Sequence, residues 1–256
     1  MIDFHIVIGG LIIGLLVGLT GVGGSALMLP VLVLLFRIPP LIAVGTDLAY
    51  SVPTKIVGAL VHRRQGTINP RLVFQLAAGG VPAAVVGVLS LAAIKAHISL
   101  DALNALIKHI VAGLLIVVAI AIVAVQFVPR KPRAEEAAGT PKAALVVLVG
   151  VIVGFAVSTT SIGAGSIGLT LLALIAPRLR LQQLVGTDIA FAAIIVPVAT
   201  VGHFTLGSVS LPVTLSLLVG SIPGVYAGSR LCGILPVKYL RPVMAGVMAF
   251  AATRLF

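Results

Sequence analysis

Charged residues are scarce in this sequence, and acidic residues are the scarcest. Only 9% of the 256 residues are charged and six are Asp or Glu, whereas 60% are hydrophobic. An average soluble domain carries roughly 25% charged residues. A chain this apolar needs lipid around it, so we expect an all-α protein that crosses the cell inner (plasma) membrane several times.

Cysteine and clustered metal ligands are also lacking. The single cysteine, Cys232, excludes an intrachain disulfide and a cysteine-based metal site. We expect no metal site and no cofactor, because the few acidic residues form no cluster with histidine. The loops are too short for a soluble catalytic domain, and no nucleophile stands beside a general base. We therefore do not expect an enzyme.

The net charge of +11 would suggest a nucleic-acid partner in a soluble protein. Here the basic residues fall mainly in loops at the ends of apolar runs, and no basic stripe with interleaved aromatics is present. We interpret them as topogenic charges that contact lipid headgroups. Membrane lipid is the expected partner, and nucleic acid is not.

Eight apolar segments fill the chain. They lie at about 6–36, 41–62, 72–94, 103–128, 143–176, 183–205, 211–233 and 239–255. Between the fourth and fifth lies "PRKPRAEEAAGTPK" (129–142), the only long polar stretch, which reads as a linker loop. The linker divides the chain into a first transmembrane repeat, 1–128, and a second, 143–256.

The two halves resemble each other at a shift of 141 residues. The shift aligns Val44, Gly45, Thr46, Asp47, Ala49, Val57, His62 and Gly66 with Val185, Gly186, Thr187, Asp188, Ala190, Val198, His203 and Gly207. Internal repeats of this kind are typical of transporter folds, although some channels share them.

The first segment of each half is longer than one membrane helix needs. Each exceeds 30 residues, which as one helix would be over ~45 Å long. The runs are interrupted by "GLTGVGG" (18–24) and "STTSIGAG" (158–165). Glycine costs about 1 kcal/mol in a helix interior, and Ser/Thr side chains compete for backbone hydrogen bonds. We predict that both segments are broken or re-entrant; the alternative is close helix packing through small residues such as Gly14 and Gly18.

Lysine and arginine positions favour re-entrant hairpins. If all eight segments cross fully, eight basic residues fall on each side. If the first and fifth are hairpins, the tally becomes 12 (Arg63, Arg64, Arg71, Arg130, Lys131, Arg133, Lys142, Arg178, Arg180, Arg230, Lys238, Arg241) against four (Arg37, Lys95, Lys108, Arg254). That is a positive-inside bias, and three crossings per half would make the repeats inverted.

Two acidic residues lie within apolar segments. A charge there costs at least ~2.5 kcal/mol, so Asp47 and Asp188 are expected to face the protein interior or water. One interpretation is structural, with each carboxylate capping backbone N–H groups near a helix N-terminus. The other is a coupling-ion site for H⁺ or Na⁺, formed with the hydroxyls of Thr46 and Thr187.

Lys55 has no counterpart in the second half, where Val196 stands. It lies about 12 Å along a helix from Asp47 at ~1.5 Å per residue, too far for their ordinary i,i+4 ion pair. It either pairs with Asp188 or binds an anion. The segment breaks would add hydrogen-bond donors for an anion near a half-helix N-terminus. The candidate substrate-binding residues are Gly23, Gly24, Ser25, Lys55, Ser158, Thr159, Thr160 and Ser161.

His62 and His203 occupy equivalent segment ends. Both are interpreted as interfacial residues or, alternatively, as a proton relay, because histidine titrates near neutral pH.

The run "GLLVGLTGVGGSALMLPVL" followed by "AVGTDLAYSVPTKIVGALVHRRQGTI" resembles the sulfite exporter TauE/SafE family, and "GFAVSTTSIGAGSIG" with "LVGTDIAFAAIIVP" resembles the repeat of that motif. Ser161 and Ala164 replace glycines expected there. The resemblance implies an inner-membrane secondary transporter, generally an exporter, of small sulfur-containing or organic anions such as sulfite or sulfoacetate. We list a second copy of the chain, in a homo-oligomer, among the expected partners. The alternative is an anion channel or uniporter without cation coupling.

Overall fold

The computed structural model describes residues 3–20, 24–127, 141–177, 179–231 and 237–255. Every regular element in these ranges is helical, and the only β-type contact among them is an isolated bridge between Gly163 and Gly165. Five of the helices are long and apolar enough to cross a membrane. The prediction of an all-α membrane protein with several crossings is confirmed.

The first half contains α1 (Phe4–Thr20), α2 (Ser25–Pro30), the π-helical turn η1 (Val31–Leu35), α3 (Pro40–Arg64), α4 (Pro70–His97) and α5 (Leu100–Phe127). The second half contains α6 (Ala143–Thr160), α7 (Ile167–Ile175), α8 (Leu181–Thr205), α9 (Leu211–Leu231) and α10 (Val237–Leu255). Pro40 and Pro70 begin α3 and α4. Proline fits the first turn because its missing N–H would have no partner there.

The first segment of each half is divided into separate helices, as predicted. α6 ends at Thr160, and the next residue, Ser161, adopts a left-handed backbone with φ of 60°. Gly163 (φ 148°) and Gly165 (φ 88°) then carry the chain through conformations that favour glycine. The chain resumes as α7, so the break has the place that the glycine and hydroxyl pattern indicated.

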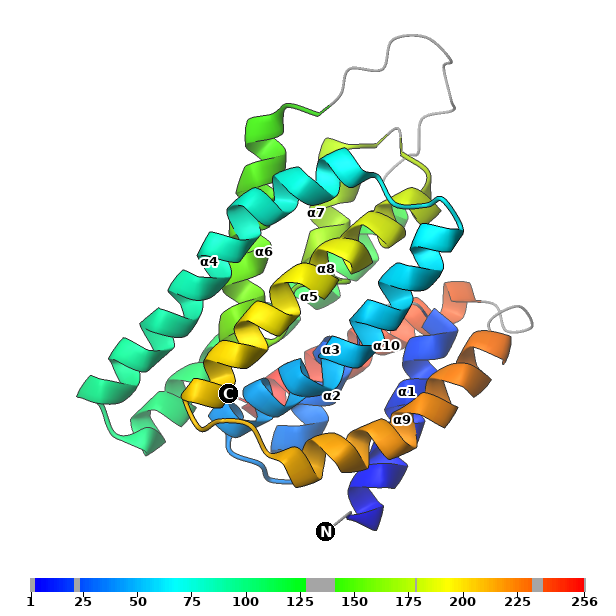
Figure 1. Cartoon of the computed structure of the whole chain (residues 1–256). Coiled ribbons are helices and arrows are strands. Elements are labelled where there is room, and N and C mark those ends of the chain that lie inside the picture. The colour runs from blue at the N-terminus through cyan, green and yellow to red at the C-terminus, as the bar shows by residue number, and fades with distance from the viewer. Residues whose placement is uncertain (1–2, 21–23, 128–140, 178, 232–236, 256) are drawn as a thin grey trace, which may run out of the picture.

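Helices of the two halves are packed against each other reciprocally. α1 packs along α9, and α4 packs along α6. α3 lies beside α8 in the middle of the molecule, and α5 packs on α10 (Figure 1). The first helix of each half therefore lies against a helix of the other half, and the core is shared between them.

The turns after α3 and α8 have the same geometry. Gly66 and Gly207 both adopt left-handed φ angles, of 64° and 66°. The following N–H groups, of Thr67 and Ser208, donate to the carbonyl groups of His62 and His203 at 3.1 and 3.0 Å. The match is local, and the division into repeats over 1–128 and 143–256 stays a prediction; the linker (129–142) falls almost wholly outside the described residues. The inverted relation of the halves stays a prediction.

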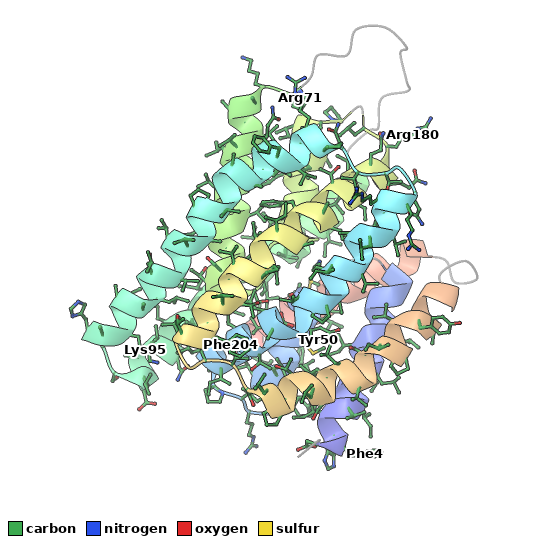
Figure 2. All side chains as sticks on the ribbon, viewed as in Figure 1. Phe4, Tyr50, Arg71, Lys95, Arg180 and Phe204 are labelled. Carbon is green, nitrogen blue, oxygen red and sulfur yellow. The ribbon has the colours of Figure 1, made fainter. Side chains whose placement is uncertain are left out.

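Two arginines from different halves of the chain lie at the same end of the molecule. Figure 2 shows Arg71 and Arg180 at one end, with Lys95, Phe204 and Phe4 at the opposite end. Full crossing by every segment would place Arg71 and Arg180 on opposite sides. Their common placement agrees with re-entrant first segments.

Candidate functional site

Two buried carboxylates lie in the centre of the molecule. Asp47 on α3 is 0% exposed and Asp188 on α8 is 1% exposed. Each is the eighth residue of its helix, and the N-cap positions belong to Pro39 and Arg180. Neither carboxylate caps its own helix, but Asp188 accepts a backbone N–H from the break before α7. The structural and the coupling-ion interpretations both stay predictions.

Asp47 is held by the break of the other half. The Ser161 hydroxyl, which follows α6, donates to Oδ2 of Asp47 at 2.6 Å. Ser25, the first residue of α2, also lies beside this carboxylate. Oδ1 of Asp47 is buried without a hydrogen-bond partner. One oxygen is thus fixed and the other is left with free acceptor capacity.

Asp188 is held by the break of its own half. The backbone N–H of Gly165 donates to Oδ2 at 2.6 Å, and Oδ1 is again buried without a partner. Gly168 lies against Oδ1 so closely that a Cβ at this position would collide with it. Glycine at 168 is therefore required for the observed position of the carboxylate.

Lys55 lies between the two carboxylates. Two turns beyond Asp47 on α3, it interacts electrostatically with Asp188 and, more weakly, with Asp47. Neither carboxylate is within the 4.0 Å of a direct ion pair. The prediction that Lys55 sits at the centre of the molecule agrees with this position. The electrostatic interaction with Asp188 matches the pairing alternative without closing an ion pair.

The three residues of each Gly-Thr-Asp motif have different roles. A Cβ on Gly45 would collide with the carbonyl of Ser208, and a Cβ on Gly186 would meet the hydroxyl of Thr67 at 2.8 Å. Glycine therefore admits the loop of the opposite half. The next residue holds that loop: the hydroxyl of Thr46 accepts the N–H of Ser210 at 3.1 Å.

The equivalent contact joins Thr187 to Asn69, also at 3.1 Å. The Thr46 and Thr187 hydroxyls thus hold loops, while the aspartates that follow them face the centre. The structure does not bring either threonine to the carboxylate that follows it.

The four hydroxyl residues at the end of α6 differ in what they contact. The hydroxyls of Ser158 and Thr159 donate to the carbonyl of Phe155, and that of Thr160 donates to Ala156, at 2.7 to 3.1 Å. Only Ser161 reaches across to the other half. In the first half, Gly24 precedes α2 and Ser25 begins it; Gly23 lies outside the described residues.

The two histidines lie in unequal surroundings. Nδ1 of His203 is 2.8 Å from the Ser208 hydroxyl, and Nε2 is 2.8 Å from the carbonyl of Ser158. Nδ1 of His62 makes the matching contact with Thr67 at 2.8 Å. His203 is fully buried, whereas His62 is partly exposed.

Two serines of the site escaped the sequence reasoning. Ser51, one turn beyond Asp47, has its hydroxyl 3.5 Å from that of Ser25. Ser166 is buried, and its hydroxyl oxygen has no partner. The repeat itself could have found Ser166, because the shift of 141 residues aligns it with Ser25. The site therefore contains one ammonium, two carboxylates with a free oxygen each, and several small hydroxyls.

Comparison with known proteins gives one consistent result. A family model described as "Sulfite exporter TauE/SafE" matches residues 6–255. The chain is 41% identical over 257 residues to the probable membrane transporter protein YjnA of Bacillus subtilis (strain 168), covering 98% of each chain. It is 28% identical over 249 residues to the probable membrane transporter protein YdhB of the same strain, covering 93% of this chain and 96% of YdhB. No solved structure matches the chain.

The matched region includes both segment breaks, both Gly-Thr-Asp motifs and Lys55. Two relatives matched over more than nine-tenths of their length carry the description of membrane transporter. The chain is a multi-pass membrane protein that belongs to the sulfite exporter TauE/SafE family of membrane transporters.

Proposed function

We propose that the protein is a secondary transporter of the inner membrane that exports small sulfur-containing or organic anions, such as sulfite or sulfoacetate, coupled to a proton or sodium gradient. The observation that carries the proposal is the position of Lys55, whose single ammonium interacts with two buried carboxylates between the two segment breaks.

In this proposal the anion binds at Lys55 and replaces the two carboxylates as the negative charge that balances the ammonium. An ammonium in an apolar interior is costly unless an opposite charge meets it. Lys55 forms no direct ion pair with either aspartate, so an exogenous anion would not have to break one to reach the ammonium. Ser25 and Ser161 supply hydroxyls beside Asp47, and Gly24 and Ser158 to Thr160 lie next to the same two breaks.

Charge balance requires a cation to accompany the anion. With Lys55, Asp47 and Asp188 all ionised, the three side chains sum to −1, which repels an anion at short range. Protonation of one carboxyl, or Na⁺ beside it, brings the sum to zero; occupancy of both brings it to +1. The unpartnered Oδ1 atoms of both aspartates offer the place for that cation. Thr46 and Thr187 support these positions from the neighbouring residues.

Flux through reconstituted protein tests the proposal. Proteoliposomes are loaded with sulfite, sulfate, thiosulfate or sulfoacetate, and pH or sodium gradients are imposed at a clamped membrane voltage. We expect one cation gradient to drive accumulation of at least one anion against its own gradient. Flux that follows the voltage alone would identify an anion channel or uniporter, and the paired aspartates would then have no role in coupling.

A further inference from the structure

A closed ring of hydrogen bonds surrounds one end of the central site. The loop after α8 donates the N–H of Ser210 to Thr46 at 3.1 Å, and the next residue, Asp47, accepts from Ser161 at 2.6 Å. Three residues earlier, the carbonyl of Ser158 meets His203, which returns to the same loop. The ring thus joins α3, the end of α6, the end of α8 and the loop 207–210.

His203 is the link that closes this ring. A carbonyl oxygen only accepts hydrogen bonds, so Nε2 carries the hydrogen that bonds Ser158. Nδ1 lies 2.8 Å from the Ser208 hydroxyl, and that hydroxyl also donates to the carbonyl of His203 at 3.0 Å. Both ring nitrogens are engaged, and His203, Ser158 and Ser208 are at most 1% exposed.

The equivalent ring at the opposite end is only partly made. Asn69 bonds Thr187, and Thr67 bonds Nδ1 of His62, as their counterparts do. Nε2 of His62, however, has no hydrogen-bond partner among the described residues, and Asp188 is bonded to Gly165 of its own half. His62, Thr67 and Asn69 are all partly exposed. Among the described residues, the two ends therefore hold equivalent parts in a buried, fully bonded arrangement and in a more exposed, partly bonded one.

We propose that His203 is a positioning residue whose hydrogen bond keeps the transport path closed at the end near Phe204. His62 makes the equivalent hydrogen bond when the opposite end is closed. The inference rests on the proposed function, because a path open at one end at a time is what coupled transport requires. Breaking the contact between Nε2 and Ser158 frees the end of α6, and with it Ser161, from the loop 207–210.

Cysteine accessibility tests this role of His203 without any substrate. In a Cys232→Ser background, Ser51→Cys places a reporter one turn from Asp47, and an impermeant thiol reagent is applied to either side of oriented vesicles. With His203 intact, we expect labelling from the side of Arg71. His203→Ala should raise labelling from the side of Phe204 by roughly 2- to 10-fold, the population shift that loss of one hydrogen bond gives.

Matched variants distinguish closure of one end by His203 from a role as a proton relay. His203→Gln keeps an N–H that reaches the carbonyl of Ser158 and should restore one-sided labelling, whereas a proton relay would not survive this change. His97→Ala, at an exposed position at the end of α4, should leave labelling unchanged. If His203→Ala does not fold, Ser208→Ala removes the hydroxyl that contacts Nδ1 and the His203 carbonyl but leaves the bond between Nε2 and Ser158, so it should give a smaller rise.

Two results would overturn the inference. One is a folded His203→Ala protein that is still labelled from the side of Arg71 alone. The other is a His203→Gln protein labelled like His203→Ala. The labelling experiment uses no anion. A failed sulfite flux assay together with the expected labelling would therefore reject sulfite as the substrate and leave the role of His203 standing.

Discussion

Lys55 is the residue that makes the two halves chemically unequal. Its counterpart Val196 is buried and apolar, so the central site has one ammonium and not two. Asp47 and Asp188, in contrast, are equivalent residues that differ only in the source of their hydrogen bond. The asymmetry of charge therefore resides in a single side chain.

Replacing Lys55 by methionine keeps a side chain of similar length without its charge. We expect anion affinity to fall by about 10- to 100-fold, the range given by ~1.5–3 kcal/mol for a hydrogen bond to a charged group. The measurement is the KM of sulfite flux in proteoliposomes, with Lys142→Met, an exposed lysine at the start of α6, as control. Unchanged KM in the folded Lys55→Met protein would remove Lys55 from the substrate site.

Gly168 tests whether the position of Asp188 matters for coupling. Gly168→Ala would put a methyl group against Oδ1 of Asp188, which can move away because it is the end of a side chain. Alanine also favours the helix by up to about 1 kcal/mol, so Tm should not fall. We expect a folded protein whose flux no longer responds to the cation gradient.

The control for this change is Gly113→Ala in α5. Nothing lies within 4 Å of a Cβ at this position, so the same gain in helix propensity should leave gradient-driven flux intact. If Gly168→Ala transports like Gly113→Ala, the observed place of Asp188 is not needed for coupling.

Helix pairs are joined along seams of glycine. A Cβ on Gly220 or Gly224 of α9 would collide with the backbone of α1, and a Cβ on Gly150 or Gly154 of α6 would collide with that of α4. Close backbone approach is how small residues stabilise helix pairs where lipid gives no hydrophobic drive. These seams fix the first helix of each half to the other half.

Gly220→Leu should separate α1 from α9. Backbone atoms of Val7 cannot shift as a side chain can, so overpacking should cost about 1–3 kcal/mol and lower the Tm in detergent by several degrees. The matched control is Gly246→Leu, an exposed position on α10 with nothing within 4 Å of its Cβ. Equal Tm values for the two variants would mean that the seam carries no packing energy.

Arg71 and Arg180 mark one end of the molecule (Figure 2). This end contains the last turn of α3, the start of α4 and the start of α8. Lys95 lies at the other end (Figure 2). Counting re-entrant segments gives 12 basic residues on this side against four. From the positive-inside rule we predict that Arg71 and Arg180 lie on the cytoplasmic side.

Single cysteines report this topology directly. In a Cys232→Ser background, Gln65→Cys and Gln182→Cys should both react with an impermeant thiol reagent from the cytoplasmic side, and His97→Cys from the other side. All three positions are exposed. If all eight segments crossed fully, Gln65→Cys and Gln182→Cys would react from opposite sides, and the re-entrant arrangement would be rejected.

Local chemistry explains how much of this protein could be predicted from its sequence. Hydropathy indicated the all-α membrane class and the apolar segments, because a lipid environment imposes length and composition on each segment separately. Glycine and hydroxyl residues located the break at 161–166, since they act on their own backbone. The cost of a buried charge singled out Asp47, Asp188 and Lys55.

Only the tertiary structure decided which half holds each carboxylate and what the threonines do. Asp47 is bonded by Ser161, 114 residues away, and Thr46 by Ser210, 164 residues away. The same motif in the sequence could not distinguish these partners from Gly165, which bonds Asp188. Such contacts depend on how α1 packs with α9 and α4 with α6, and no single segment encodes the relative position of two others.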